Sequence, residues 1–221
     1  MTASGTEGLS TTEPAVAGLV PGSPGRDAYP IGFPVVALVA SAGGVGALAE
    51  VLGSLPPGLP AAVIVALHQD PHRASHLVHV LGRATRLPVD LAVDNARMRP
   101  GRVLVVPPAY HLLITSEARI GLVATGSLPP ARPSADLLLA TLAVTCGARA
   151  LAVVLTGMGH DGQTGVRAID HCGGTTIAQD AATSAFPSMP AAAVTTGLVS
   201  RTLSLGAIAP AIVGHVSALV R

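Results

Sequence analysis

Three polar residues of this sequence each follow a largely apolar run in which half of the residues are β-branched. They are Ser41 after residues 35–40, His68 after residues 62–67, and Asp161 shortly after residues 151–156. A serine, a histidine and an aspartate can act together as nucleophile, general base and orienting acid. The sequence therefore predicts a serine hydrolase site. The chain order Ser, His, Asp differs from that of the α/β-hydrolases, so their fold is not implied.

The serine lies in Val39-Ala40-Ser41-Ala42-Gly43-Gly44, where a strand pattern runs into a glycine-rich turn and then a helix pattern. Such a turn can expose a hydroxyl above a sheet, and the helix start adds free backbone N–H donors. Val39 breaks the G-x-S-x-G form of a nucleophile elbow. A helix N-cap is the alternative role for Ser41.

His68 has three interpretations. As a general base it would face a cleft with its Nε2 beside the Ser41 hydroxyl, and Asp161 would serve it in preference to the adjacent His160. As a structural residue it would only be hydrogen-bonded. Three further histidines follow at near-helical spacing, which is compatible with metal binding; they are His72, His76 and His79. Pro71 separates them from His68, so a solvated histidine-rich helix face is favoured and no metal site is predicted.

The stretch Gly157–Gly162 contains the pattern G-x-G-x-x-G between a strand and a helix, and Asp180 follows eighteen residues after Gly162. This spacing is typical of dinucleotide-binding proteins. Against it, Asp161 would place a carboxylate where the pyrophosphate must lie. The other interpretation is a turn that receives an anion while Asp161 orients an imidazole. Nucleotide binding stays the alternative function.

The elements that must position these residues alternate between strand and helix patterns. Strands are expected at 35–40, 62–67, 103–106, 151–156 and 175–178, and helices at 45–52, 74–83, 134–146, 162–171, 190–196 and 206–220. Residues 111–115 and 120–123 predict an antiparallel hairpin. Continuous apolar strands indicate a mainly parallel sheet covered on both faces. The expected fold is a doubly wound α/β sandwich, whose sites lie at the carboxyl ends of the strands.

The amino-acid composition disfavours several classes of partner and excludes several classes of chemistry. The 221 residues are 49% hydrophobic and 11% charged with a net charge of +1, which disfavours nucleic acid and anionic membranes as partners. No residue is Lys, which excludes Schiff-base chemistry and a Walker A lysine. No apolar run is long enough to insert into a membrane. Cys146 and Cys172 are expected to be reduced thiols in a cytoplasmic protein.

Residues 1–30 are rich in Gly, Pro, Ser and Thr and lack apolar periodicity, so we expect a flexible tail there. Residues 31–221 are expected to form one catalytic domain, because a chain of this length buries a full core as a single α/β unit.

Several stretches in order resemble the catalytic domain of the chemotaxis protein-glutamate methylesterases. They are Ala40-Ser41-Ala42-Gly43-Gly44, the strand ending at His68, Arg99-Pro100-Gly101-Arg102-Val103, Pro107 to Leu112, Arg132-Pro133-Ser134-Ala135-Asp136, Leu155 to Gly162, and Ala178-Gln179-Asp180 through Ser184 to Met189-Pro190. Leu155 to Gly162 is the most specific of them.

The resemblance implies that Ser41 is the nucleophile, His68 its base and Asp161 the partner of the histidine, with the backbone N–H of Met158 helping to hold the oxyanion. It implies hydrolysis of glutamate methyl esters on the cytoplasmic helices of chemoreceptors, deamidation of receptor glutamines, and no metal or organic cofactor. A catalytically decayed interaction domain of the same fold is a further alternative.

The sequence departs from the family at two places that border the site. Ala42 stands where the family commonly has Thr, and Gln69-Asp70 stands where Met-Pro is usual. The family usually also carries an N-terminal receiver domain, for which thirty residues are too few. We therefore expect no phosphorylation control in cis.

Overall fold

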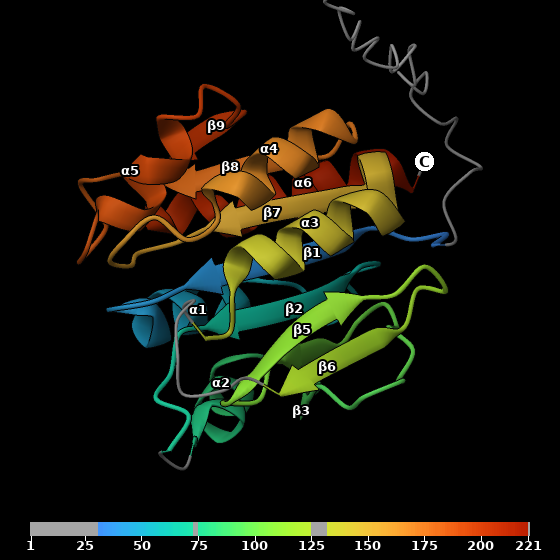
Figure 1. Ribbon diagram of the computed structural model, residues 1–221. Helices are drawn as coiled ribbons and strands as arrows, with labels where there is room; N and C mark the ends of the chain where they lie inside the picture. Colours follow the sequence, from blue (N-terminus) through green and yellow to red (C-terminus); the bar gives the residue numbers. More distant parts are fainter. Residues whose placement is uncertain (1–30, 73–74, 125–131, 221) are drawn as a thin grey trace, which may run out of the picture.

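A computed structural model describes residues 31–72, 75–124 and 132–220 (Figure 1). The expected tail at residues 1–30 lies outside them. Seven parallel strands form one sheet in the order β3-β4-β2-β1-β7-β8-β9, and β5 and β6 form an antiparallel pair. The strands are β1 (Val35–Ala40), β2 (Ala62–Leu67), β3 (Val89–Leu91), β4 (Val103–Val105), β5 (Tyr110–Ile114), β6 (Ile120–Ala124), β7 (Ala150–Val154), β8 (Thr175–Gln179) and β9 (Arg201–Leu203).

Helices cover both faces of the large sheet (Figure 1). Helices α1, α2 and α6 pack on one face, and α3, α4, α5 and the hairpin pack on the other. Their bounds are α1 (Gly44–Gly53), α2 (Leu77–Ala84), α3 (Ala135–Cys146), α4 (Gln163–His171), α5 (Ser188–Val194) and α6 (Leu205–Leu219), and a short 3₁₀ turn, Gly147–Arg149, precedes β7. The expected doubly wound sandwich is confirmed.

The central strand β1 shows why the apolar runs are continuous. Its six residues are all fully buried, and successive side chains point to opposite faces. Leu38 therefore belongs to the core beneath α1, α2 and α6, whereas its neighbours Ala37 and Val39 belong to the core beneath α3, α4 and α5. A strand buried on both faces has no position that favours a polar residue.

The order in which the chain adds strands to the sheet creates a crevice at the carboxyl ends of the strands. From β1 the chain continues to β2 on one side, and it later returns to β7 on the other side of β1. In doubly wound sheets this reversal opens a crevice between the loops that leave the two strands. Ser41 follows β1, and Thr156 and Gly157 come just after β7. The fold therefore brings these loops together.

Two strands, β3 and β9, were not expected from the sequence. Each has three residues and lies at an edge of the sheet with mostly exposed side chains, so neither forms an apolar run. Strands β1 and β2 have the expected bounds, and the other expected elements differ by a few residues at their ends. No helix in the described ranges is both long and apolar enough to span a membrane.

Candidate active site

Ser41 lies in a tight turn between β1 and α1. Its backbone N–H donates to the carbonyl oxygen of Thr156 over 3.0 Å, which joins the turn to the end of β7. Its own carbonyl accepts from the N–H of Gly44 over 2.9 Å. Gly43 has a φ of +74°, a conformation that glycine adopts without strain. The turn ends one strand and starts one helix within three residues.

Gly157 packs directly against Ser41. A Cβ atom added at Gly157 would lie 2.8 Å from the Ser41 Cβ and 2.6 Å from the sulfur of Met189. Only glycine allows this close approach. Met158 follows Gly157 and is 59% exposed.

A buried polar network holds the loop after β1 and the loop after β7 in place. The Thr156 N–H donates to Oε1 of Gln179 over 2.8 Å, and both residues are 2% exposed. The Thr156 hydroxyl donates to the carbonyl of Ala42 over 3.1 Å. The hydroxyl also accepts from the N–H of Phe186 over 2.9 Å. Because the buried groups are satisfied, the turn that carries Ser41 has one defined position.

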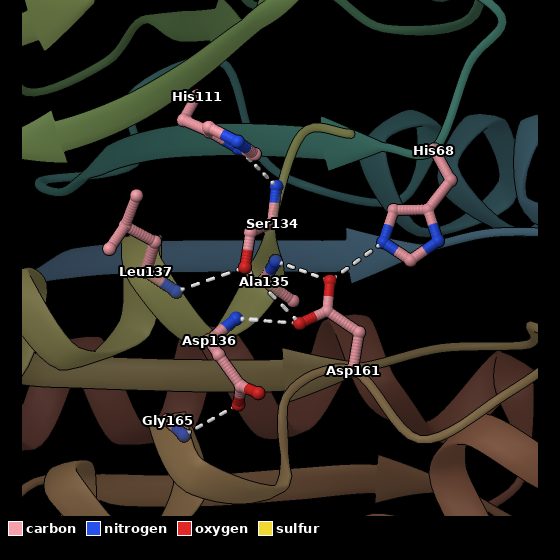
Figure 2. Close-up of polar contacts among 8 residues, drawn as sticks. All are labelled: His68, His111, Ser134, Ala135, Asp136, Leu137, Asp161 and Gly165. Carbon is pink, nitrogen blue, oxygen red and sulfur yellow. Dashed lines mark hydrogen bonds and ion pairs between the residues drawn. The ribbon is translucent and has the colours of Figure 1, made fainter. Parts of the chain in front are cut away.

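Asp161 is held at the N-terminus of α3 (Figure 2). Its Oδ2 accepts from the N–H of Ala135 over 2.7 Å, and its Oδ1 accepts from the N–H of Asp136 over 3.0 Å. The Ser134 hydroxyl donates to Oδ1 over 3.3 Å. Free N–H groups and the helix dipole both favour a negative charge there. The start of α3 is therefore a cradle for this carboxylate.

The cradle also sets the ionisation of Asp161. Burial alone would raise the pKa of Asp161. The hydrogen bonds from His68 and from the N–H groups of Ala135 and Asp136 lower it, and together they outweigh burial, so the net pKa is below the ordinary value of 3.8. The carboxylate is thus charged at neutral pH. It is 13% exposed, which keeps its interaction with a neighbouring imidazole little screened by water.

His68 follows β2 and hydrogen-bonds to this carboxylate, with 2.9 Å between its Nε2 and Oδ2 of Asp161 (Figure 2). The structure thus pairs Asp161 with His68, and the catalytic role of this pair stays a prediction. The expectation that Nε2 faces Ser41 is wrong, because Asp161 approaches from the α3 side and occupies that nitrogen. An ionised carboxylate can only accept, so Nε2 carries the proton and Nδ1 is the basic nitrogen.

Ser41 and His68 line one cavity of about 480 Å³. The apolar side chains of Leu67, Leu77 and Val80 form part of its wall. Among the described residues that line it there is no carboxylate and no guanidinium. Ser41 is partly exposed and lies at the wall of this cavity.

The alternative site over Gly157–Gly162 differs from a dinucleotide cradle. At the start of α4, Oδ1 of Asp136 accepts from the N–H of Gly165 over 2.8 Å. The protein's own carboxylate therefore lies where a pyrophosphate would bind. Within the described residues, no group of three or more His, Cys, Asp or Glu side chains is arranged to hold a metal ion.

Sequence reasoning missed the residues that hold Asp161. Ser134, Ala135 and Asp136 come from a different segment, and their contribution is mostly backbone N–H. The available signal was Ser134 itself, since a serine just before a helix pattern is typical of an N-cap, and its hydroxyl does accept from the N–H of Leu137. An N-cap pattern alone does not reveal which acceptor lies above the helix.

The fold and the site together define an α/β protein with a carboxylate–imidazole pair beside a serine at the switch point of a parallel sheet. Comparison with known proteins identifies its family. The family model described as CheB methylesterase matches residues 36–212. The chain belongs to the CheB methylesterase family.

The relatives agree with this family. The chain is 39% identical over 180 residues to the protein-glutamate methylesterase FrzG of Myxococcus xanthus, covering 81% of this chain and 54% of the relative. It is 40% identical over 190 residues to a protein-glutamate methylesterase/protein-glutamine glutaminase of Moorella thermoacetica, covering 84% and 45%. This chain thus spans about half the length of the curated relatives it matches.

A solved structure shows the same fold. The CheB methylesterase catalytic domain of Thermotoga maritima superposes with a TM-score of 0.79 at 28% sequence identity. The match covers 83% of this chain and 99% of that domain.

Proposed function

We propose that this protein is a serine-type carboxylic-ester hydrolase that removes methyl groups from glutamate side chains of a protein and deamidates glutamine side chains. The hydrogen bond between His68 and Asp161, at the cavity that His68 shares with Ser41, carries this proposal. Curated relatives named for both activities support it.

The geometry supports one role for each of these residues. Asp161 keeps the proton of His68 on Nε2, so Nδ1 can accept the proton of the Ser41 hydroxyl as its oxygen attacks the ester carbonyl. The oxyanion forms beside the turn after β7, where the backbone N–H of Met158 would donate to it. The imidazolium is stabilised by the charged Asp161 carboxylate.

The reaction then completes in two steps. The tetrahedral intermediate collapses, His68 returns the proton to the methoxy group, and methanol leaves a glutamyl ester on Ser41. His68 next takes a proton from a water molecule that attacks this ester. As the second tetrahedral intermediate collapses, His68 returns that proton to the Ser41 oxygen, which restores the hydroxyl and releases the glutamate side chain. With a glutamine substrate, ammonia leaves in place of methanol.

The cavity fits an uncharged substrate. Its wall at Leu67, Leu77 and Val80 can pack against the methylene stem and methyl group of the ester. The described residues that line it carry no carboxylate and no guanidinium, so this part of the wall favours a neutral ester or amide group.

We place the substrate in the cytoplasmic domain of a chemoreceptor, as the family resemblance implies, and the protein in the cytoplasm. The test is methanol release from a synthetic peptide that contains glutamate γ-methyl ester, followed by the same assay on a methylated receptor fragment. Wild-type protein should release methanol, and Ser41→Ala should lower turnover by several orders of magnitude. Ser204→Ala, at an exposed serine far along the chain, is the matched control.

Asp161→Asn separates hydrolysis from nucleotide binding. For a hydrolase the variant should stay folded and lose up to about 10⁴-fold in turnover, with KM little changed. For a nucleotide site, removing the negative charge should strengthen NAD binding. Tighter NAD binding without catalytic loss would overturn the proposal.

A further inference from the structure

His111 lies behind the cradle of Asp161 and has no part in the mechanism above. It belongs to β5, which packs against α3, and is 9% exposed. Its Nδ1 accepts from the backbone N–H of Ser134 over 3.0 Å (Figure 2). Ser134 is the N-cap of α3, and its hydroxyl donates to Asp161. One imidazole thus holds the residue that begins the cradle.

This contact fixes the protonation state of His111. A backbone N–H can only donate, so Nδ1 must be without a proton and the ring must be neutral. Burial lowers the pKa of His111; of the charged groups that act on it, Asp161 raises this pKa and Arg132 lowers it. The environment therefore agrees with the neutral ring that the hydrogen bond requires.

We propose that His111 is a positioning residue: as a neutral imidazole it fixes the backbone at Ser134 and so keeps the α3 cradle, with Asp161, aligned on His68. The role of this alignment in catalysis rests on the function proposed above. The hydrogen bonds run from His111 on β5 to Ser134 at the start of α3, then to the Asp161 carboxylate, which holds the imidazole of His68.

The mechanical reason is that the cradle is built from consecutive residues. Ser134 carries the N–H that His111 holds, and the next two N–H groups, of Ala135 and Asp136, hold Asp161. If Nδ1 gains a proton, two donors face each other and Ser134 must move away. The cradle then shifts, and Asp161 shifts relative to His68. A displacement of about 1 Å can cost about a hundredfold in rate.

Two substitutions at position 111 separate positioning from simple packing. In His111→Asn the side-chain oxygen can take the place of Nδ1 as acceptor but does not titrate. In His111→Leu the volume is kept and the acceptor is lost. His171→Leu, at an exposed histidine of α4, is the matched control. Thermal unfolding establishes which variants are folded.

The first readout is the pH profile of kcat/KM for methanol release from the glutamate γ-methyl ester peptide. In the wild type both His68 and His111 must be unprotonated, so the acid side of the logarithmic plot should approach a slope of two. His111→Asn should keep kcat at neutral pH within about threefold and reduce this slope to one. His111→Leu should lower kcat about tenfold to a hundredfold. His171→Leu should match the wild type.

The second readout does not depend on esterase activity. In nitrogen-15 NMR spectra, the Ser134 amide signal should titrate together with the His111 ring, and His111 should carry its proton on Nε2. The His68 Nε2–H signal should be kept in His111→Asn and shifted or lost in His111→Leu. If the wild type releases no methanol, the proposed function fails, and these spectra alone decide the positioning role.

A folded His111→Leu protein with an unchanged His68 signal would overturn the proposal. So would wild-type kcat in that variant, or an acid slope of two that persists in His111→Asn.

Discussion

Gly157→Ala probes how closely the loop after β7 is fitted to Ser41. Carbon atoms pack at about 3.5–4.0 Å, whereas the new Cβ would lie 2.8 Å from the Ser41 Cβ. An overlap of about 0.7 Å or more must be relieved. The second close contact, 2.6 Å to the sulfur of Met189, can relax by rotation of a flexible side chain. Ser41 cannot rotate away, because its backbone N is only 3.1 Å from the same Cβ.

The expected result follows from this overlap. Ser41 must move by most of an ångström, which should lower kcat for methanol release about a hundredfold. Overpacking should also lower the free energy of unfolding by about 1–3 kcal/mol. Urea unfolding measures the second effect, and both are measured on the same preparation.

Gly214→Ala is the matched control, since its added Cβ has no atom within 4 Å apart from its chain neighbours and the backbone of its own helix, and the position is inside α6. It should keep full activity and gain about 0.5–1 kcal/mol of stability. Gly157→Ala with wild-type turnover and an unchanged unfolding midpoint would refute the close fit between Gly157 and Ser41.

Three further predictions concern stability and reactivity. Burial raises the pKa of the Cys146 thiol to about 12, so a thiol reagent should label it only after unfolding; labelling of the native protein would contradict its burial. Burial also lowers the pKa of His215 from 6.5, so the unfolded state binds more protons and the stability of the protein should fall as the pH drops below 6.5. In urea titrations at several pH values, His215→Met should show a weaker dependence of stability on pH. An unchanged dependence would exclude His215 as its source. Gly165→Ala would place a Cβ 2.5 Å from the Leu139 Cβ, so it should separate α4 from α3 and lower the thermal midpoint, which calorimetry would detect; an unchanged midpoint would show that the two helices can move apart freely.

The central part of the fold could be predicted because its strands are buried on both faces. The observed bounds of β1 and β2 equal the expected ones, since a continuous apolar run of β-branched residues has few other structures open to it. The edge strands β3 and β9 could not be predicted, because three mostly exposed residues give no pattern.

The site was predictable to the level of which strand ends meet. Parallel strands place Ser41 and His68 at the same edge of the sheet, and the loop after β7 adds Asp161. The nitrogen of His68 that faces Asp161 was not predictable. It depends on the side from which the carboxylate approaches, which α3 fixes through backbone N–H groups at Ala135 and Asp136. Backbone donors leave no trace in residue types.

Intact mass spectrometry after treatment with a fluorophosphonate probe tests the proposed serine mechanism most directly. Such a probe forms a stable adduct with an activated serine hydroxyl. The wild type should gain one adduct, which peptide mapping places on Ser41, and methanol release should stop in proportion. Ser41→Ala should gain none. An adduct on another residue, or methanol release that continues after Ser41 is fully modified, would contradict the mechanism.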